Sequence, residues 1–148
     1  MSLQEWFSEG RLRQHKTSAS EVTELLRVVD RDLSDAEIRQ LSADRRFATA
    51  YNATLQLATI ALYAAGSRAS STGHHWVTLR ALPEIMGPQA KERADYFDAC
   101  RSKRNLADYD RAGIISDAEA DELLREARAF KADLIDWLSA NHPHLVPR

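Results

Sequence analysis

Apolar residues recur at helical spacing along most of the chain. One stripe begins at Val22 and Leu25, and a second runs from Ile38 to Ala65 over about eight turns. A third stripe, within residues 120–138, follows the same rule. Spacings of three and four residues place side chains on one face of an α-helix. Because the chain has only five Gly and four Pro and lacks the alternation that marks strands, we expect it to be helical throughout.

Serines followed three positions later by a glutamate mark the predicted helix starts. In such a capping box the hydroxyl and the carboxylate each accept a hydrogen bond from a backbone N–H. The pattern occurs at Ser18 with Glu21, Ser34 with Glu37, and Ser116 with Glu119. We therefore expect helices over about 18–31, 34–65, 89–107 and 116–140. Gly66 ends the second of them, since glycine commonly follows the last helical residue.

The remaining segments are shorter. Small polar side chains at residues 67–73 predict a flexible loop, and Pro83 and Gly87 restrict the stretch from residue 74 to a short, broken helix. Residues 1–17 and 141–148 are expected to be irregular tails. Together these elements predict an all-α fold, an up-and-down bundle of four to five helices, in a single domain that spans residues 1–148.

The composition is that of one ordinary globular domain, with 148 residues of which 44% are hydrophobic and 28% charged. The formal net charge of -2 excludes a global basic field, so any contact with nucleic acid must be local. Cys100 is the only cysteine, which excludes an internal disulfide and a cysteine-built zinc site and fits a reducing compartment. The longest apolar run, residues 57–65, is too short for a membrane span. We therefore expect a cytoplasmic protein.

The segment 100–110, CRSKRNLADYD, holds the candidate functional residues. On a helix, Arg101, Arg104 and Asp108 share one face, and Asn105 and Tyr109 occupy the adjoining strip. Two guanidiniums offer planar donors for phosphate, and an amide with a phenol suits a base or ribose. The segment therefore predicts a nucleotide or RNA site. The same spacing also makes an ordinary Arg104–Asp108 ion pair on a solvated helix, and that interpretation stays open.

The other polar motifs favour structural roles. His74 and His75 are adjacent, so on a helix they point about 100° apart and cannot form the i, i+4 pair of a helical metal site. The pair Arg45-Arg46 is interpreted as part of a solvated face. The sequence contains no glycine-rich phosphate loop, serine nucleophile elbow or HExxH motif. We therefore expect neither a metal nor a cofactor.

The run Arg104-Asn105-Leu106-Ala107-Asp108-Tyr109, between two long predicted helices, resembles the HEPN domain family (higher eukaryotes and prokaryotes nucleotide-binding). Ala50-Tyr51-Asn52, the alanine-rich run 57–66 and the His74-His75 start after a polar loop are similar to that family too. The resemblance covers roughly residues 34–140. It implies a helical bundle that forms a homodimer. It also implies the toxin or ribonuclease half of a bacterial toxin-antitoxin or stress-response pair, with a small nucleotidyltransferase as partner.

The sequence departs from the family's active ribonucleases at one position. In those proteins an Arg is followed four to six residues later by a His, whereas Arg104 is followed there by Asp108, Tyr109 and Asp110. Metal-free RNA cleavage needs a group that exchanges a proton near neutral pH, and an exposed Asp beside an Arg stays ionised. We therefore expect nucleotide or RNA binding rather than cleavage. The expected contacts are Arg101, Arg104, Asn105 and Tyr109, with Asp108 holding Arg104 in place.

Two alternatives remain at this point. The first is a metal-independent endoribonuclease with an altered active site, in which Asp108 or Tyr109 replaces the histidine and acts with Arg104. The second is a non-catalytic structural or interaction dimer, in which the alanine-rich helix forms the seam and Arg104 makes only an ion pair.

Overall fold

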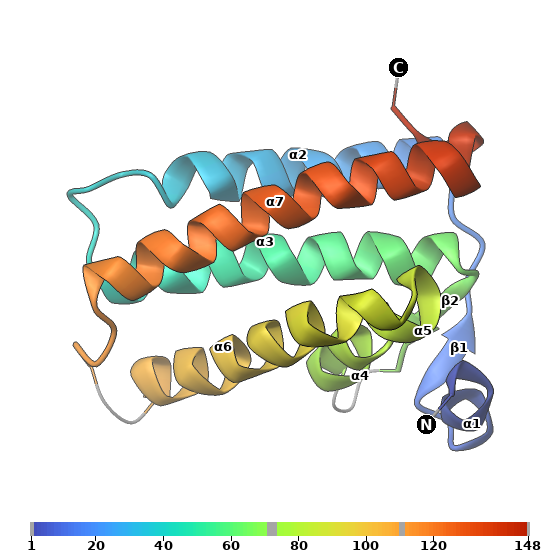
Figure 1. The fold of residues 1–148 in the computed structure, drawn as a ribbon, viewed down its shortest axis with the longest axis horizontal. Coiled ribbons are helices and arrows are strands. Elements are labelled where there is room, and N and C mark those ends of the chain that lie inside the picture. Colours follow the sequence, from blue (N-terminus) through green and yellow to red (C-terminus); the bar gives the residue numbers. More distant parts are fainter. Residues whose placement is uncertain (1, 71–73, 110–111, 148) are drawn as a thin grey trace.

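The computed structural model describes residues 2–70, 74–109 and 112–147. Its four long helices alternate in direction along the bundle, as Figure 1 shows. They are α2 (Ala19–Asp35), α3 (Ala43–Ala64), α6 (Lys91–Tyr109) and α7 (Asp117–Asn141). The predicted all-α, up-and-down bundle is confirmed. None of the helices among the described residues has the length and apolar character that a membrane span requires.

Helix α3 is the central helix of the bundle and packs against α2, α6 and α7 (Figure 1). Its small side chains let these neighbours approach closely, because alanine adds little bulk between two helix backbones. Four of its alanines have no solvent exposure, namely Ala50, Ala53, Ala58 and Ala61. Those alanine positions therefore face neighbouring helices of the same chain and are not accessible to a second copy.

Aromatic and aliphatic side chains from α6 and α7 complete the core above α3. Phe97 of α6 and Phe130 of α7 are essentially buried, and their ring centroids lie 5.4 Å apart. The buried positions of α7 repeat at helical spacing and are Ala120, Leu123, Ala127, Phe130, Leu134 and Leu138. The stripe predicted for the last helix is thus the face that it buries.

Two of the three predicted helix starts are confirmed. Ser116 and Glu119 form a complete capping box at the start of α7. Ser18 caps α2 by accepting a hydrogen bond from the Glu21 backbone N–H at 3.1 Å. The Glu21 carboxylate instead bonds the His15 ring at 2.6 Å and the Thr17 hydroxyl at 2.8 Å, which ties the preceding loop to the helix.

The predicted start at Ser34 is wrong. Helix α2 continues through residues 31–33 to Asp35, and α3 begins only after Ser42, whose hydroxyl accepts a hydrogen bond from the Arg45 backbone N–H. The Glu37 carboxylate, expected to complete a box with Ser34, forms an ion pair with Arg128 on α7. The break between the helices therefore lies at residues 36–42.

The prediction of irregular tails is also wrong. Within residues 1–17 lie α1 (Leu3–Ser8) and β1 (Leu12–Gln14), and β1 pairs antiparallel with β2 (Ser67–Ala69), inside the predicted loop. Trp6 is only 3% exposed and packs in a small cluster with residues from β1, α3 and α4. At the other end, a 3-10 turn over Pro143–Leu145 buries Leu145. Apolar side chains anchor both ends.

The predicted short, broken helix is confirmed as α4 (His74–Arg80) and α5 (Leu82–Met86), followed by a 3-10 turn at Pro88–Ala90. Pro83 near the start of α5 lacks the N–H that would continue the α4 hydrogen-bonding pattern. Both helices lie beside α6 and below the end of α3 in Figure 1. Helix α4 brings His75 beside Tyr51 of α3 and Arg80 beside Asp98 of α6.

A buried arginine joins α3 to the start of α7. Arg46 is 2% exposed, and its two terminal nitrogens reach Asp117 at 2.7 Å and Asp121 at 2.8 Å. Arg39 from the preceding loop also reaches Asp121, at 3.1 Å. The interpretation of the Arg45-Arg46 pair as solvated therefore holds only for Arg45, which is exposed.

Candidate functional site

The guanidinium of Arg104 lies over the ring of Tyr51. The Arg104 Cζ atom is 5.0 Å from the ring centroid, a distance typical of a cation–π contact. Tyr51 is fully buried in the middle of α3, so its ring is a fixed platform beneath a side chain that is 23% exposed. Packing between α3 and α6 thus positions one of the two arginines that the sequence analysis selected.

His75 from α4 contacts the same tyrosine. The Tyr51 hydroxyl and the His75 Nδ1 atom are 3.2 Å apart, and their rings are tilted at 35° with centroids 6.0 Å apart. Burial raises the pKa of Tyr51 to about 12, even though Arg104 and Arg101 oppose the effect. The phenol therefore stays protonated at neutral pH. When its O–H donates a hydrogen bond to Nδ1, the proton of the neutral imidazole lies on Nε2.

Arg101 belongs to an ion-pair network on the same side of α6. Its Nε atom donates to the Asp98 carboxylate at 2.9 Å, and Arg80 from α4 donates to the other Asp98 oxygen at 3.0 Å. Arg80 also pairs with Asp95, which accepts a hydrogen bond from Lys91 at 2.9 Å. The network fixes α4 against α6, and the terminal nitrogens of Arg101 have no hydrogen-bond partner among the described residues.

The three remaining predicted site residues differ in their contacts. The Asn105 side-chain oxygen accepts a hydrogen bond from an Arg104 terminal nitrogen at 3.1 Å. Asp108 is exposed, and its carboxylate is 3.9 Å from the Arg104 Nε atom, which is too long for a hydrogen bond. The buried Nε atom of Arg104 therefore has no hydrogen-bond partner in the described part of the chain. The Tyr109 side chain lies outside the described residues.

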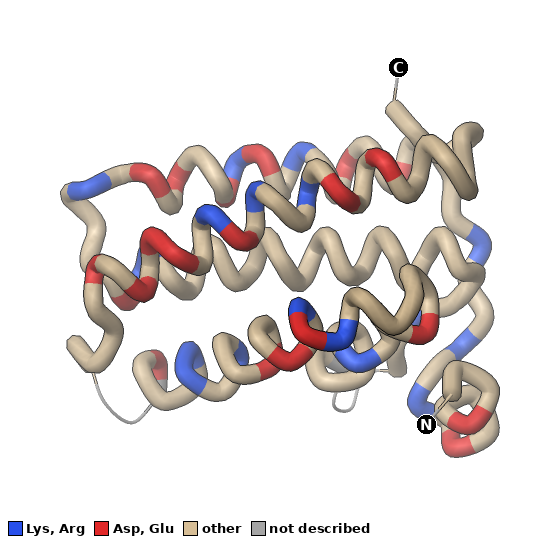
Figure 2. Tube along the Cα trace, in the orientation of Figure 1, with Lys and Arg blue, Asp and Glu red and all other residues tan. Residues whose placement is uncertain are grey.

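Positive charge exceeds negative charge locally around these residues, although the whole chain is slightly acidic. Figure 2 shows basic positions toward the C-terminal end of α6 and acidic positions at the start of α7. The cluster comprises four cations and three carboxylates, namely Lys91, Arg80, Arg101 and Arg104 with Asp95, Asp98 and Asp108. Such a cluster attracts an anion more weakly than a bare arginine pair, but it orients the guanidiniums.

We expect the ion pairs of Asp98 with Arg101 and Arg80 to make the stability of the fold depend on pH. Burial raises the pKa of Asp98, but hydrogen bonds from Arg101 and Arg80 outweigh burial and hold the pKa below its ordinary value of 3.8. A carboxyl with a lowered folded-state pKa stabilises the fold above pH 3.8, and this contribution is lost as the pH falls through the folded-state value.

Urea denaturation followed by circular dichroism at pH 7 and at steps below pH 4 measures this effect. We expect Asp98→Asn to lower the free energy of unfolding at pH 7 and to flatten its decline in acid relative to the unmodified protein. Asp136→Asn, at an exposed carboxylate elsewhere on α7, serves as the control. If the free energy of unfolding declined equally with falling pH in all three proteins, the ion pairs of Asp98 would have no role in the pH dependence.

Comparison with known families identifies the domain. A model of the SAV_6107-like HEPN family matches residues 36–134, which is about two thirds of the chain. The chain belongs to the HEPN family. The match spans α3, α4, α5 and α6 and most of α7, so it includes every residue of the cluster around Arg104. No curated protein and no solved structure shows a significant match.

The HEPN resemblance selected Tyr51 and His75 in the sequence, but only as parts of family-like segments. The structure places the Tyr51 ring against Arg104, which lies 53 residues later in the chain, and places His75 against the hydroxyl of the same tyrosine. Sequence reasoning missed this juxtaposition, and it missed Arg80 and Asp98 entirely. The available signal was the resemblance at 50–52 and 74–75 in the same chain as the Arg104 motif. Spacing along one helix cannot reveal a contact between helices.

Among the residues that the structure describes, no group of three or more His, Cys, Asp or Glu side chains is arranged to hold a metal ion. Cys100 is buried beside Tyr96 and Lys103, where burial raises the pKa of its thiol to about 11. Arginine, histidine, tyrosine and asparagine groups are therefore the ones that could contact a ligand.

Proposed function

We propose that this HEPN domain binds the phosphate groups of RNA or of a nucleotide through Arg104 and Arg101. The observation that carries the proposal is the stacking of the Arg104 guanidinium on the buried Tyr51 ring. Stacking restricts the side chain before any ligand arrives, so less conformational entropy is lost on binding. An Nη group of Arg104 and the terminal nitrogens of Arg101 supply planar donors for phosphate oxygens.

Neighbouring groups suit the remainder of a nucleotide. The Asn105 amide adjoins the Arg104 guanidinium through their hydrogen bond and adds a donor pair for a base or ribose. Arg101 is held by Asp98 and is 25% exposed, so it is oriented but accessible. Tyr109 follows on the same part of α6 and is the further proposed contact.

RNA binding tests the proposal through a double variant. We expect Arg101→Ala/Arg104→Ala to weaken binding of a fluorescent single-stranded RNA about tenfold in anisotropy titrations and to reduce the salt dependence of the affinity. Titration with a mononucleotide in parallel distinguishes RNA from a free nucleotide as the source of the phosphate.

Arg68→Ala/Arg125→Ala is the matched control for this experiment, because it also removes two positive charges. Both arginines are exposed and have no ion pair among the described residues, so their removal changes the net charge without touching the site. Equal weakening of RNA binding by the control variant would show that the affinity depends only on the net charge of the protein. Binding of neither RNA nor nucleotide would favour the alternative of a non-catalytic interaction protein.

We also propose that the protein works as a homodimer within a toxin-antitoxin or stress-response pair, with a nucleotidyltransferase-type partner. The support for this part is membership of the HEPN family. Co-expression with the product of an adjacent gene, followed by purification through a tag on one chain only, tests the pairing. Sedimentation of the isolated protein tests the dimer.

A second candidate function is metal-independent RNA cleavage, which the position of His75 favours. In this reaction the ribose 2′-oxygen attacks the adjacent phosphorus while its proton passes to a base, and the 5′-oxygen leaves as it accepts a proton. Arg104 would stabilise the charge that develops on the phosphate, and His75 would transfer a proton. Asp108 and Tyr109 are the groups expected in that role from the sequence, whereas His75 contacts the tyrosine on which Arg104 stacks.

A further inference from the structure

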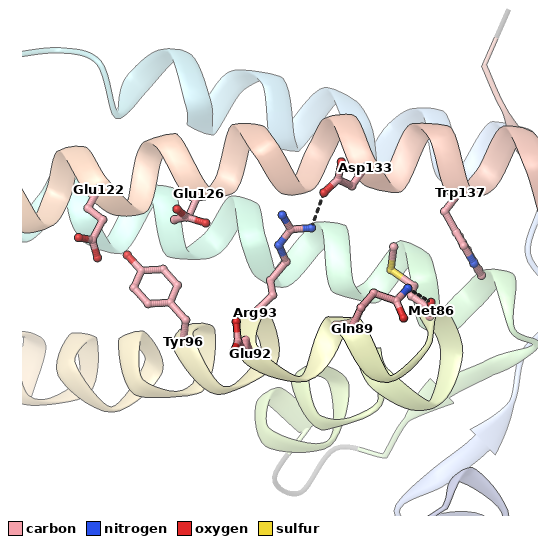
Figure 3. A pocket seen from close by; sticks show the side chains of 10 residues that line it. Met86, Gln89, Glu92, Arg93, Tyr96, Glu122, Glu126, Asp133 and Trp137 are labelled. Atoms are coloured by element: carbon pink, nitrogen blue, oxygen red, sulfur yellow. Dashed lines mark hydrogen bonds and ion pairs between the residues drawn. The ribbon is translucent and has the colours of Figure 1, made fainter.

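The opposite side of α6 borders a groove of quite different character. A cavity of about 600 Å³ lies between α6 and α7, and its lining is shown in Figure 3. Half-buried Met86, Tyr96 and Trp137 supply apolar surface. Its carboxylates are Glu92 from α6 and Glu122, Glu126 and Asp133 from α7. We call this surface the acidic groove.

The carboxylates of α7 form a regular row along the acidic groove. Residues 119, 122, 126 and 133 are separated by three, four and seven positions, so they share one helix face. The two ends of the row are paired with α6, because Lys103 reaches Glu119 and Arg93 reaches Asp133. The Tyr96 hydroxyl points toward Glu122 in Figure 3, and neither Glu122 nor Glu126 has a cationic partner among the described residues.

Arg93 shows how a cation binds in the acidic groove. Its guanidinium donates to the Asp133 carboxylate at 2.8 Å, drawn as a dashed line in Figure 3, and lies over the Phe130 ring with its Cζ atom 5.3 Å from the centroid. The Arg93 side chain is 24% exposed and the Asp133 side chain 58% exposed, so water is partly excluded from the guanidinium and not from the carboxylate. Glu126 lies one heptad before Asp133 on α7, where an incoming cation would meet a comparable carboxylate.

We propose that the acidic groove binds an amphipathic helix of another protein, one that presents lysine or arginine side chains beside apolar ones. The cationic side chains pair with Glu122 and Glu126, and the apolar side chains cover Met86, Tyr96 and Trp137. Glu122 and Trp137, the first and last residues of α7 that line the acidic groove, are 15 residues apart, or about 22 Å along the helix axis. That length matches a helix of about four turns.

Charge excludes the other obvious occupants of the acidic groove. Nucleic acid is repelled by the row of carboxylates. A symmetric dimer through this face would place the carboxylates of one copy against those of the other. The cations without an ion pair in the described part of this chain are scattered, with Arg13 on β1, Lys16 in the loop before α2, Arg45 on α3, Arg68 on β2 and Arg125 on α7. No helix of the described residues therefore offers the required basic face.

A pair of designed peptides tests this proposal on the full chain. The probe is a helix of about 18 residues with leucines along one stripe, flanked by lysine and arginine, and its counterpart carries glutamate at every basic position. We expect saturable binding of the basic peptide in fluorescence anisotropy. Glu122→Gln/Glu126→Gln is expected to weaken this binding about tenfold, because two charge pairs with the peptide are lost.

Glu5→Gln/Glu84→Gln is the matched control, since it neutralises two exposed carboxylates outside the acidic groove. Its affinity for the basic peptide should stay within about twofold of the unmodified protein. Equal weakening by both double variants, equal binding of the acidic peptide, or failure of the basic peptide to bind would each overturn the proposal. Amide chemical-shift changes outside residues 86–103 and 119–137 would do so too.

The result of the peptide-binding experiment does not depend on the proposed phosphate site. The acidic groove shares no residue with the Arg104 cluster, because Arg93 pairs with Asp133 of α7 whereas Arg104 stacks on Tyr51 of α3. The Glu122→Gln/Glu126→Gln variant should therefore bind RNA as the unmodified protein does. A loss of both activities would indicate damage to the fold.

Discussion

Arg46→Ala should lower the free energy of unfolding by about 3 kcal/mol, the lower end of the range for breaking a buried ion pair. The side chain is 2% exposed, so its removal leaves a cavity between α3 and α7 and deletes two charged hydrogen bonds. The loss stays at the lower end because Asp117 is 77% exposed and Asp121 keeps Arg39 as a partner. Neither carboxylate is left buried and alone.

Thermal unfolding followed by circular dichroism measures this loss as a decrease in Tm of about 6–12 °C. Arg45→Ala, one position earlier at an exposed arginine of the same helix, is the control and should change Tm little. Arg46→Met fills most of the volume without charge and should cost only about 1 kcal/mol, since the buried Arg46 Nε atom already lacks a hydrogen-bond partner. An Arg46→Met protein as unstable as Arg46→Ala would contradict a packing role and assign the stability to the ion pairs.

His75→Ala should reduce the rate of metal-independent RNA cleavage about 100-fold, if the cleavage proposal is correct, because general acid–base groups contribute at least that much. Binding of RNA should remain within about twofold, since the arginines that contact phosphate are retained. The measurement is the appearance of fragments with 2′,3′-cyclic phosphate ends from a labelled RNA in EDTA. A pH–rate profile across the imidazole range supplies a readout that a merely structural role would not change.

Two variants make the cleavage result decisive. His144→Ala, at an exposed histidine near the C-terminal end of the described chain, should cleave like the unmodified protein. Tyr51→Phe keeps the ring beneath Arg104 but removes the hydroxyl that contacts His75, so it should reduce cleavage less than His75→Ala. Cleavage that survives both His75→Ala and Arg104→Ala would be due to a contaminating nuclease and would refute the proposal.

Local sequence patterns predicted most of the helices. The apolar stripes of α2 and α7 appear in the structure as buried faces, and Ser18 and Ser116 are their N-caps. Both features depend on residues within one or two turns of each other, which is why periodicity and capping chemistry reveal them. The Arg101–Arg104 face of α6 was predictable for the same reason.

Local patterns failed where distant contacts decided between alternatives. Ser34 and Ser42 are both plausible N-caps. No helix begins at Ser34, because α2 continues past it and buries Leu33, and because Glu37 pairs with Arg128 instead of with Ser34. The strand Leu12–Gln14 has no strand pattern of its own and forms because Ser67–Ala69 is brought beside it. Tertiary context commonly overrides weak local preference in this way.

The sequence by itself determined the helical class, the bundle topology, the family and the two arginines on one face of α6, because short-range spacing and composition encode each of them. The tertiary structure alone decided which groups surround those arginines. Tyr51, His75 and Arg80 reach the site from α3 and α4, and the carboxylates of α7 meet Tyr96 across the acidic groove. These contacts arise because apolar helix faces pack together, and packing brings together residues that are far apart in the sequence. Spacing along the chain therefore does not predict them.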